Sequence, residues 1–190
     1  MGTIADRSHA IASWLDSMAM NPQDPPVSIV DAVLDEPAMS AWAERLGAVL
    51  RGGDVVLLRG PMGAGKTTLT RALARGLGVA RPERVCSPTY TVCMIHASPP
   101  ARPGLVHLDL FRLGEQGPVG SAAFESLGLE HDELPGPARV LVVEWSELWL
   151  DPPSEQLRIT LARTPDDLRA VRVEGFGRRW SGAELPAPSA

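Results

Sequence analysis

Lysine is almost missing from this sequence, and so is any excess of positive charge. Lys66 is the only lysine among 18 lysines and arginines in 190 residues, and 23 aspartates and glutamates leave a net charge of −5. This charge argues against a protein that binds nucleic-acid backbones by itself, although it is compatible with contact to nucleic acid through a partner protein. Aromatic residues make up only 5%, so the core of the single domain we expect is built from aliphatic residues and alanine.

Cysteines and long apolar runs are also scarce. Cys86 and Cys93 are the only cysteines, too few for a disulfide framework, and we expect reduced thiols in the core. A metal site that adds His96 and His107 is the alternative, but the spacing matches no common zinc pattern. No run reaches the roughly 18 apolar residues of a membrane span, and no secretory signal is visible. We therefore expect a cytoplasmic protein without a membrane role.

One segment, residues 60–68, reads GPMGAGKTT and fits the pattern G-x-x-x-x-G-K-[ST] of phosphate-binding loops. Its glycines permit tight turns and a close approach of the backbone to a ligand. Successive backbone N–H groups then face phosphate oxygens, and Lys66 adds a compact positive charge. The hydroxyl of Thr67 lies where Mg²⁺ bridging two phosphates is bound. The segment predicts nucleotide binding.

The flanking residues support this interpretation over a chance glycine-rich turn. Residues 54–59 form a β-branched and aliphatic run that is typical of a buried strand. Downstream, an apolar stripe with helical spacing is formed by Leu69, Leu73, Ala74 and Leu77. The loop therefore joins a strand to the N-terminus of a helix, which favours anions.

Two further aliphatic strands each end in an acid, Asp109 after residues 105–108 and Glu144 after residues 140–143. Ligands of open α/β sheets bind at the carboxyl ends of the strands. Either acid could hold Mg²⁺ or polarise an attacking water, or it could merely cap the next turn. Thr89, beside a proline after the loop helix, is a candidate switch residue; the alternative is an ordinary kink in an edge strand.

The remaining chain predicts further elements of one domain over residues 27–176. Residues 27–34 read as a strand, residues 157–162 and 168–174 as a hairpin, and residues 122–127 as a short helix. A helix begins near Pro37 and ends near Leu50; its inward side chains are expected to be Trp42, Leu46, Val49 and Leu50.

The two ends of the chain are expected to lie outside this domain. Residues 1–26 form an N-terminal extension that we expect to be flexible, with a short helix over residues 4–20. Docking to a partner or to a membrane surface is the alternative, although the segment is not basic. Residues 177–190, with two prolines, are expected to be disordered.

Four motifs occur in a fixed order along the chain: G-x-x-GAGKTT-x-x-R at 60–71, SPTYT at 87–91, H-x-DL-[FY]-R at 107–112 and VEW at 143–145. Together they resemble the TsaE family, small bacterial P-loop ATPases of the tRNA threonylcarbamoyladenosine pathway. The resemblance covers roughly residues 30–175. A P-loop alone is unspecific, whereas this ordered set is specific.

The resemblance implies an α/β fold of the P-loop NTPase type, with three layers and helices flanking a central mixed, mostly parallel sheet. It implies ATP and Mg²⁺ as ligands, and an ATPase activity that is weak alone and coupled to partner proteins. The implied partners are TsaB and TsaD, of which TsaD transfers threonylcarbamoyl to adenosine 37 of tRNA. Contact with tRNA is implied only through that complex.

The resemblance also implies roles for individual residues. Nucleotide binding is assigned to Met62, Gly63, Ala64, Gly65, Lys66, Thr67, Thr68 and the switch threonine Thr89. Metal binding is assigned to Thr67 and Glu144, and catalysis to Lys66, Asp109 and Glu144. The chain departs from the family at Met39, where a threonine near the adenine is usual, and at Ser146, where a proline is usual.

Two other function classes compete with an ATPase switch. A small-molecule P-loop kinase is the first, but such kinases close an arginine-rich lid over the phosphates, and residues 114–136 contain no arginine. A module that binds nucleotide without hydrolysis is the second, and the two acids at strand ends argue against it.

Overall fold

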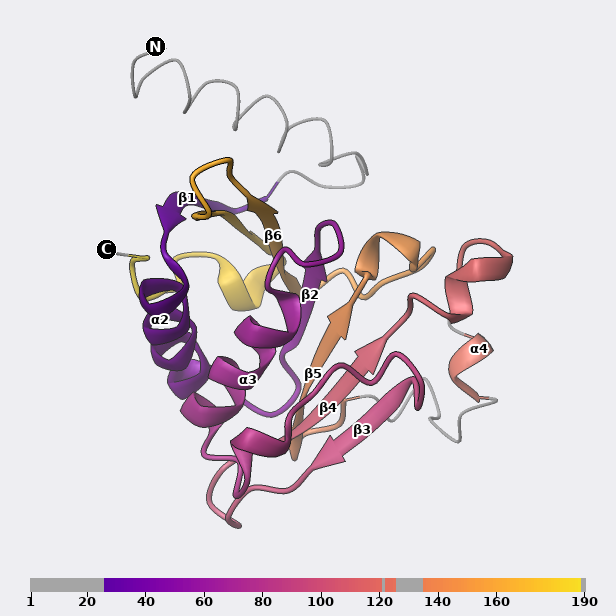
Figure 1. The fold of residues 1–190 in the computed structure, drawn as a ribbon. Coiled ribbons are helices and arrows are strands. Elements are labelled where there is room, and N and C mark those ends of the chain that lie inside the picture. Colours follow the sequence, from indigo (N-terminus) through magenta and orange to yellow (C-terminus); the bar gives the residue numbers. More distant parts are fainter. Residues whose placement is uncertain (1–25, 121, 126–134, 189–190) are drawn as a thin grey trace.

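The computed structural model describes residues 26–120, 122–125 and 135–188. These residues form a seven-stranded sheet with the order β1-β7-β6-β2-β5-β4-β3 (Figure 1). The helix expected over residues 4–20 lies outside the described residues.

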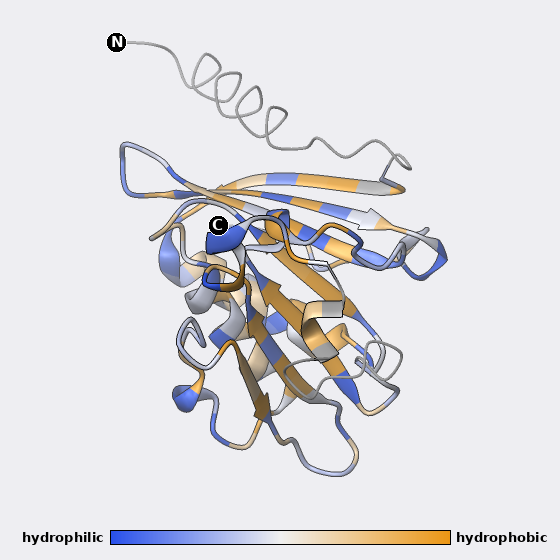
Figure 2. Cartoon of the chain, turned by 90° about the vertical axis from the view of Figure 1, so that its right-hand side faces the viewer, coloured by the Kyte–Doolittle hydropathy of each residue, from blue (hydrophilic) through white to orange (hydrophobic). Residues whose placement is uncertain are grey.

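The centre of the sheet is parallel. Four parallel strands occupy it: β6 (Gln156–Arg163), β2 (Val55–Arg59), β5 (Arg139–Glu144) and β4 (Gly104–Asp109). They are rich in valine, leucine and isoleucine, as expected for strands covered on both faces, and Figure 2 shows their hydrophobic character. Antiparallel strands complete both edges: β3 (Cys93–His96) beside β4, and β7 (Arg169–Phe176) with β1 (Ser28–Leu34) beside β6. The expected strand and hairpin are confirmed.

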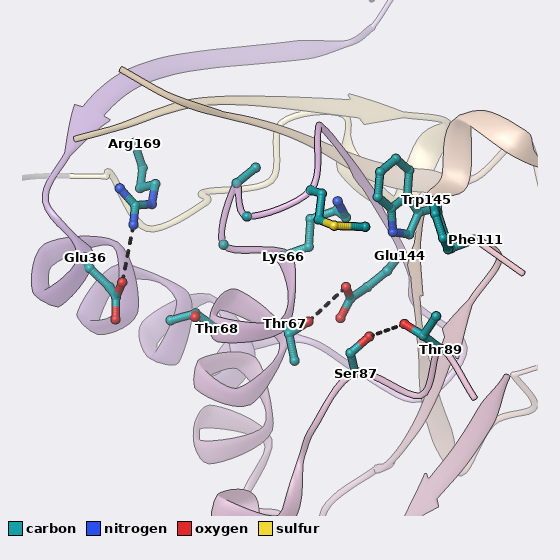
Figure 3. Close-up of a pocket in the computed structure, with 14 residues that line it drawn as sticks. Glu36, Lys66, Thr67, Thr68, Ser87, Thr89, Phe111, Glu144, Trp145 and Arg169 are labelled. Atoms are coloured by element: carbon teal, nitrogen blue, oxygen red, sulfur yellow. Dashed lines mark hydrogen bonds and ion pairs between the residues drawn. The ribbon is translucent and has the colours of Figure 1, made fainter. Parts of the chain in front are cut away.

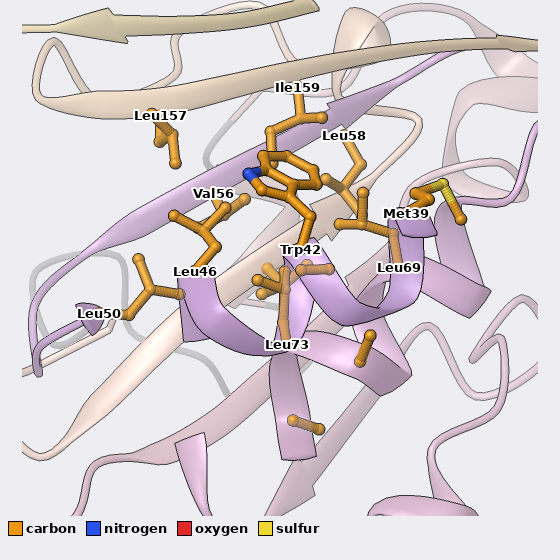
Figure 4. Packing of buried hydrophobic residues seen from close by; sticks show 14 of the residues in the cluster. Met39, Trp42, Leu46, Leu50, Val56, Leu58, Leu69, Leu73, Leu157 and Ile159 are labelled. Carbon is orange, nitrogen blue, oxygen red and sulfur yellow. The ribbon is translucent and has the colours of Figure 1, made fainter. Parts of the chain in front are cut away.

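Two helices, α2 (Glu36–Val49) and α3 (Lys66–Leu77), cover one face of the sheet. Glycines let them pack closely, because a Cβ on Gly76 would lie 2.0 Å from the carbonyl oxygen of Glu44. Trp42 packs between these helices and the sheet (Figure 4). Val49, expected to face inward, is 43% exposed, whereas the next residue, Leu50, is 4% exposed, so Val49 lies at the margin of the buried stripe of α2.

The opposite face carries shorter elements: η2 (Leu113–Gln116), α4 (Ala122–Glu125) and η4 (Ser146–Leu148). Phe124 and Trp149 meet edge to face with ring centroids 4.9 Å apart, and both belong to the apolar cluster on this side of the sheet. The expected three-layer α/β fold is confirmed, with a thinner second helical layer. No helix in the described part of the chain is both long and apolar enough to span a membrane.

The C-terminal segment corrects an expectation, because residues 177–188 are ordered against the domain. A 3₁₀ turn, η5 (Arg178–Trp180), buries Trp180 to 1% exposure within the same core as Trp42. The indole Nε1 of Trp42 also donates to the carbonyl oxygen of Pro186 at 2.8 Å, and Arg179 pairs with Asp54 at 2.9 Å. One buried tryptophan outweighs the disorder-promoting composition around it.

Candidate nucleotide-binding site

Residues 60–68 connect the end of β2 to the first turn of α3. Gly60, Gly63 and Gly65 have φ values of 133°, 77° and 105°, which favour glycine. A Cβ on Gly60 would lie 2.1 Å from the carbonyl oxygen of Leu161, whereas a Cβ on Gly63 would meet no atom within 4 Å. Packing against β6 therefore demands the first glycine, and the loop is open to a ligand at Gly63.

The side chain of Lys66 lies on this loop and is only 4% exposed as a residue. Its ammonium donates to the carbonyl oxygens of Gly60 at 2.6 Å and Pro61 at 3.0 Å. It also lies 3.8 Å from the centroid of the Trp145 ring, a cation–π contact. Burial lowers the pKa of Lys66, an effect opposed by nearby carboxylates, first that of Glu144. The loop thus holds one positive charge at its centre.

Glu144 contacts the first turn of α3 from the end of β5. Its Oε2 accepts a hydrogen bond of 3.0 Å from the hydroxyl of Thr67, and its Oε1 lies 2.8 Å from Nε2 of His107. Both side chains of the histidine–glutamate pair are nearly completely buried, at 0% and 3% exposure. A hydroxyl and a carboxylate oxygen side by side are ligands that Mg²⁺ prefers.

Asp109 is the neighbour of Glu144 across the β4–β5 pair, but its carboxylate contacts a different segment. Its Oδ2 accepts from the hydroxyls of Ser87 at 2.7 Å and Thr89 at 2.6 Å, and its Oδ1 accepts from the backbone N–H of Phe111 at 2.9 Å. The two acids therefore divide the site: Glu144 faces the loop helix, and Asp109 fixes the segment that carries Thr89.

These groups surround one cavity of about 420 Å³ (Figure 3). Of the expected site residues, the following line it: Met62, Gly63, Ala64, Gly65, Lys66, Thr67, Thr68, Thr89 and Glu144. Asp109 is not among the lining residues and lies behind Thr89. Sequence reasoning gave no site role to five lining residues: Glu36, Ser87, Phe111, Trp145 and Arg169. Three of them lie in the motifs, whereas Glu36 and Arg169 belong to no motif and come from elements far from the loop in sequence.

The two cysteines and the alternative metal site were also subjects of expectations from the sequence. Cys86 is exposed and Cys93 is half-buried, so the expectation that both are core thiols is wrong, because Cys86 lies on the loop between η1 (Pro82–Arg84) and β3. Within the described ranges no group of three or more His, Cys, Asp or Glu side chains could hold a metal ion. The alternative metal site with His96 and His107 gains no support.

Comparison with known proteins agrees with the four motifs. Residues 33–171 match the family model described as threonylcarbamoyl adenosine biosynthesis protein TsaE. This chain belongs to the TsaE family. It is similar to the tRNA threonylcarbamoyladenosine biosynthesis protein TsaE of Streptomyces coelicolor, with 40% identity over 152 residues, or 77% of this chain and 97% of that protein.

Other relatives extend the comparison. The TsaE protein of Bacillus subtilis is 36% identical over 141 residues, which are 74% of this chain and 81% of that protein. Among solved structures, the crystal structure of Bacillus subtilis YdiB has a TM-score of 0.62 at 28% identity and covers 80% of this chain and 89% of its own. The P-loop fold and the family's role in tRNA threonylcarbamoyladenosine biosynthesis thus agree with the expectations from the sequence.

Proposed function

We propose that this TsaE-family protein binds ATP with Mg²⁺ in the cavity beside residues 60–68 and hydrolyses it to ADP and phosphate. The observation that carries the proposal is the contact of Thr67 with Glu144 at 3.0 Å, at the N-terminus of α3 and beside the buried ammonium of Lys66. A hydroxyl, a carboxylate and an ammonium around an open glycine loop are the set of groups that a metal-bound triphosphate requires.

Each group of the loop has a part in holding the phosphates. Backbone N–H groups of residues 62–68 donate to phosphate oxygens, and Lys66 exchanges its carbonyl acceptors for phosphate oxygens. The Thr67 hydroxyl and Glu144 would hold Mg²⁺, which would neutralise the charge that develops in the reaction. Catalysis in such a site depends mostly on positioning and charge stabilisation.

Asp109 has a different part in the proposed mechanism. Its carboxylate accepts both hydroxyls of Ser87 and Thr89, so it sets the position of the segment that would sense the γ-phosphate. A threonine that changes partner between Asp109 and the nucleotide gives the protein two states, as in other P-loop switches. We propose that these two states make the protein a switch subunit rather than an independent enzyme.

The proposed partners are TsaB and TsaD, and the proposed context is the modification of adenosine 37 in tRNA. The relatives named above are tRNA threonylcarbamoyladenosine biosynthesis proteins, which supports this context. The net charge of −5 favours contact with tRNA through the complex over direct binding of its backbone.

Single-turnover hydrolysis and ATP affinity, measured with and without TsaB–TsaD, test this function. We expect Glu144→Ala to retain ATP affinity within about tenfold and to lose at least about a hundredfold in rate. Asp109→Ala should lose more in the complex than alone, because it acts through the switch segment. Normal hydrolysis by Glu144→Ala in both settings would contradict the proposal, and transfer of phosphate to a small acceptor would favour a kinase.

A further inference from the structure

Arg169 reaches the proposed nucleotide cavity from an element with no P-loop motif. It is the first residue of β7, is 7% exposed and lines the cavity. Figure 3 shows it beside Glu36, at the opposite end of the cavity from Ser87 and Thr89. The side chain points to the helix side of the sheet, like Val171 two residues later, which belongs to the core under α2 and α3.

The guanidinium of Arg169 is held in place but not saturated. Its Nη1 donates to the carbonyl oxygen of Asp167 at 2.6 Å and to the carboxylate of Asp167 at 2.9 Å. Its Nη2 lies 3.4 Å from the carboxylate of Glu36. Nε is buried and has no hydrogen-bond partner among the described residues. Because Nε is buried against the loop, the donors that this cavity-lining side chain can offer to a ligand are the N–H groups of Nη2, which are held only by the long contact with the exposed carboxylate of Glu36.

The direction in which a nucleotide fits the cavity follows from the two ends of the loop. Thr67, Glu144 and Thr89 lie at the end where Mg²⁺ and the terminal phosphate belong. Arg169 lies on the other side of the loop, where its Nε is 3.5 Å from the place that a Cβ on Gly65 would take. A nucleotide whose phosphates fill the loop must therefore extend its nucleoside toward Arg169.

We propose that Arg169 binds the nucleoside half of the nucleotide, with Nη2 donating to an acceptor atom of the base or ribose. This inference rests on the proposed ATP site and adds a ligand contact to it. Since two hydrogen bonds to Asp167 fix the guanidinium before a ligand arrives, little side-chain entropy is lost on binding. The contact explains how a loop that recognises only phosphates discriminates a nucleotide from a bare polyphosphate.

Calorimetric titration of the full chain with ATP and with inorganic tripolyphosphate, both with Mg²⁺, tests this role. For Arg169→Ala we expect ATP affinity to fall about tenfold or more, while tripolyphosphate affinity changes by less than about threefold. Arg169→Lys retains the positive charge without the planar guanidinium and should show the same selective loss. Arg163→Ala is the matched control, because Arg163 lies on the same hairpin and pairs with Asp167 while 58% of its side chain is exposed; it should bind both ligands like the wild type.

Three results would overturn the inference. Unchanged ATP affinity in both folded Arg169 variants would show that the nucleoside lies elsewhere. An equal loss of ATP and tripolyphosphate affinity would show a phosphate contact instead. Wild-type protein that binds neither ligand would refute the ATP site itself, a failure distinct from the first two. If Arg169→Ala does not fold, as judged by thermal unfolding, Arg169→Lys decides the matter.

Discussion

His107 and Glu144 form a buried pair, with Nε2 of the imidazole 2.8 Å from Oε1 of the carboxylate. Nδ1 of His107 is buried without a partner in the described part of the chain. A bare lone pair on the unpartnered Nδ1 is less costly than an N–H there would be. We therefore place the proton on Nε2, which donates it to Glu144. The pair occupies Oε1 and leaves Oε2 directed at Thr67. His107 thus orients the acid that we propose as a metal ligand.

Replacing His107 by leucine should therefore lower hydrolysis and weaken the Mg²⁺ dependence of ATP binding. Removal of a residue that orients a metal ligand typically costs about 10- to 100-fold in metal affinity or activity. His107→Gln places an amide N–H near the position of Nε2 and should restore part of the loss. The measurement is ATP affinity as a function of Mg²⁺ concentration, together with single-turnover rates. Equal behaviour of the leucine and glutamine variants would show that His107 acts only through packing.

Trp180 should be a major contributor to stability although it lies close to the C-terminus. Its side chain is 1% exposed in the core beside α2, and truncation of a buried tryptophan to alanine costs about 3–5 kcal/mol in the free energy of unfolding. Chemical unfolding of Trp180→Ala measures this cost. The exposed neighbour Arg178 supplies the control, Arg178→Ala, which should stay within about 0.5 kcal/mol of the wild type. A Trp180→Ala protein as stable as this control would contradict the packing of residues 177–188 against the domain.

The environment of Glu147 predicts that replacing this residue changes the stability of the protein by an amount that depends on pH. Glu147 is exposed as a residue, but desolvation of its carboxyl group raises the pKa of Glu147, while backbone hydrogen bonds, Lys66 and Arg59 act in the opposite sense. The folded state thus holds this proton to a higher pH than the unfolded chain does. The unfolded chain loses its proton first as the pH rises above about 4.3, and stability falls until the folded pKa is passed.

The Glu147→Gln protein lacks this loss of stability. Its free energy of unfolding relative to the wild type should therefore increase as the pH rises from 4 to 7. Thermal unfolding of both proteins across this range is the measurement. Glu83→Gln, an exposed position on η1, is the control for a general effect of removing a negative charge. A difference between Glu147→Gln and wild type that is the same at both ends of the range would contradict the pKa argument.

Much of the site could be predicted because its parts carry local signals. The glycine loop and the aliphatic runs before Asp109 and Glu144 are patterns of a few adjacent residues, and the α/β fold follows from their order. The pairing of the two acids across β4 and β5 depends on strand register, which local patterns do not fix. The contact between His107 and Glu144, 37 residues apart, follows from that register and was not predicted.

The wrong or missing predictions share a physical cause: the tertiary packing of the chain determines whether these side chains are buried or exposed. Trp180 belongs to the same buried cluster as Trp42, 138 positions earlier in the chain, so the composition of its own segment was misleading. Arg169 is one of many arginines, and only its position over Gly65 distinguishes it. Val49 fits the helical spacing from Trp42 and Leu46, but it lies at the margin of the buried stripe and is 43% exposed. Tertiary context overrides local pattern at these positions.

The central claim is that residues 60–68 hold the phosphates of ATP through Lys66, and calorimetric titration of Lys66→Ala with Mg²⁺ and ATP tests it most directly. Arg75→Ala, which removes a partly exposed positive charge of the same helix that pairs with Glu44, is the control. The account predicts that Lys66→Ala loses at least about a hundredfold in affinity, or about 2.7 kcal/mol, while Arg75→Ala binds normally. Because burying the ammonium is itself costly, the melting temperature of Lys66→Ala should stay within about 2–4 °C of the wild type. A folded Lys66→Ala protein that binds ATP as tightly as the wild type would contradict the account.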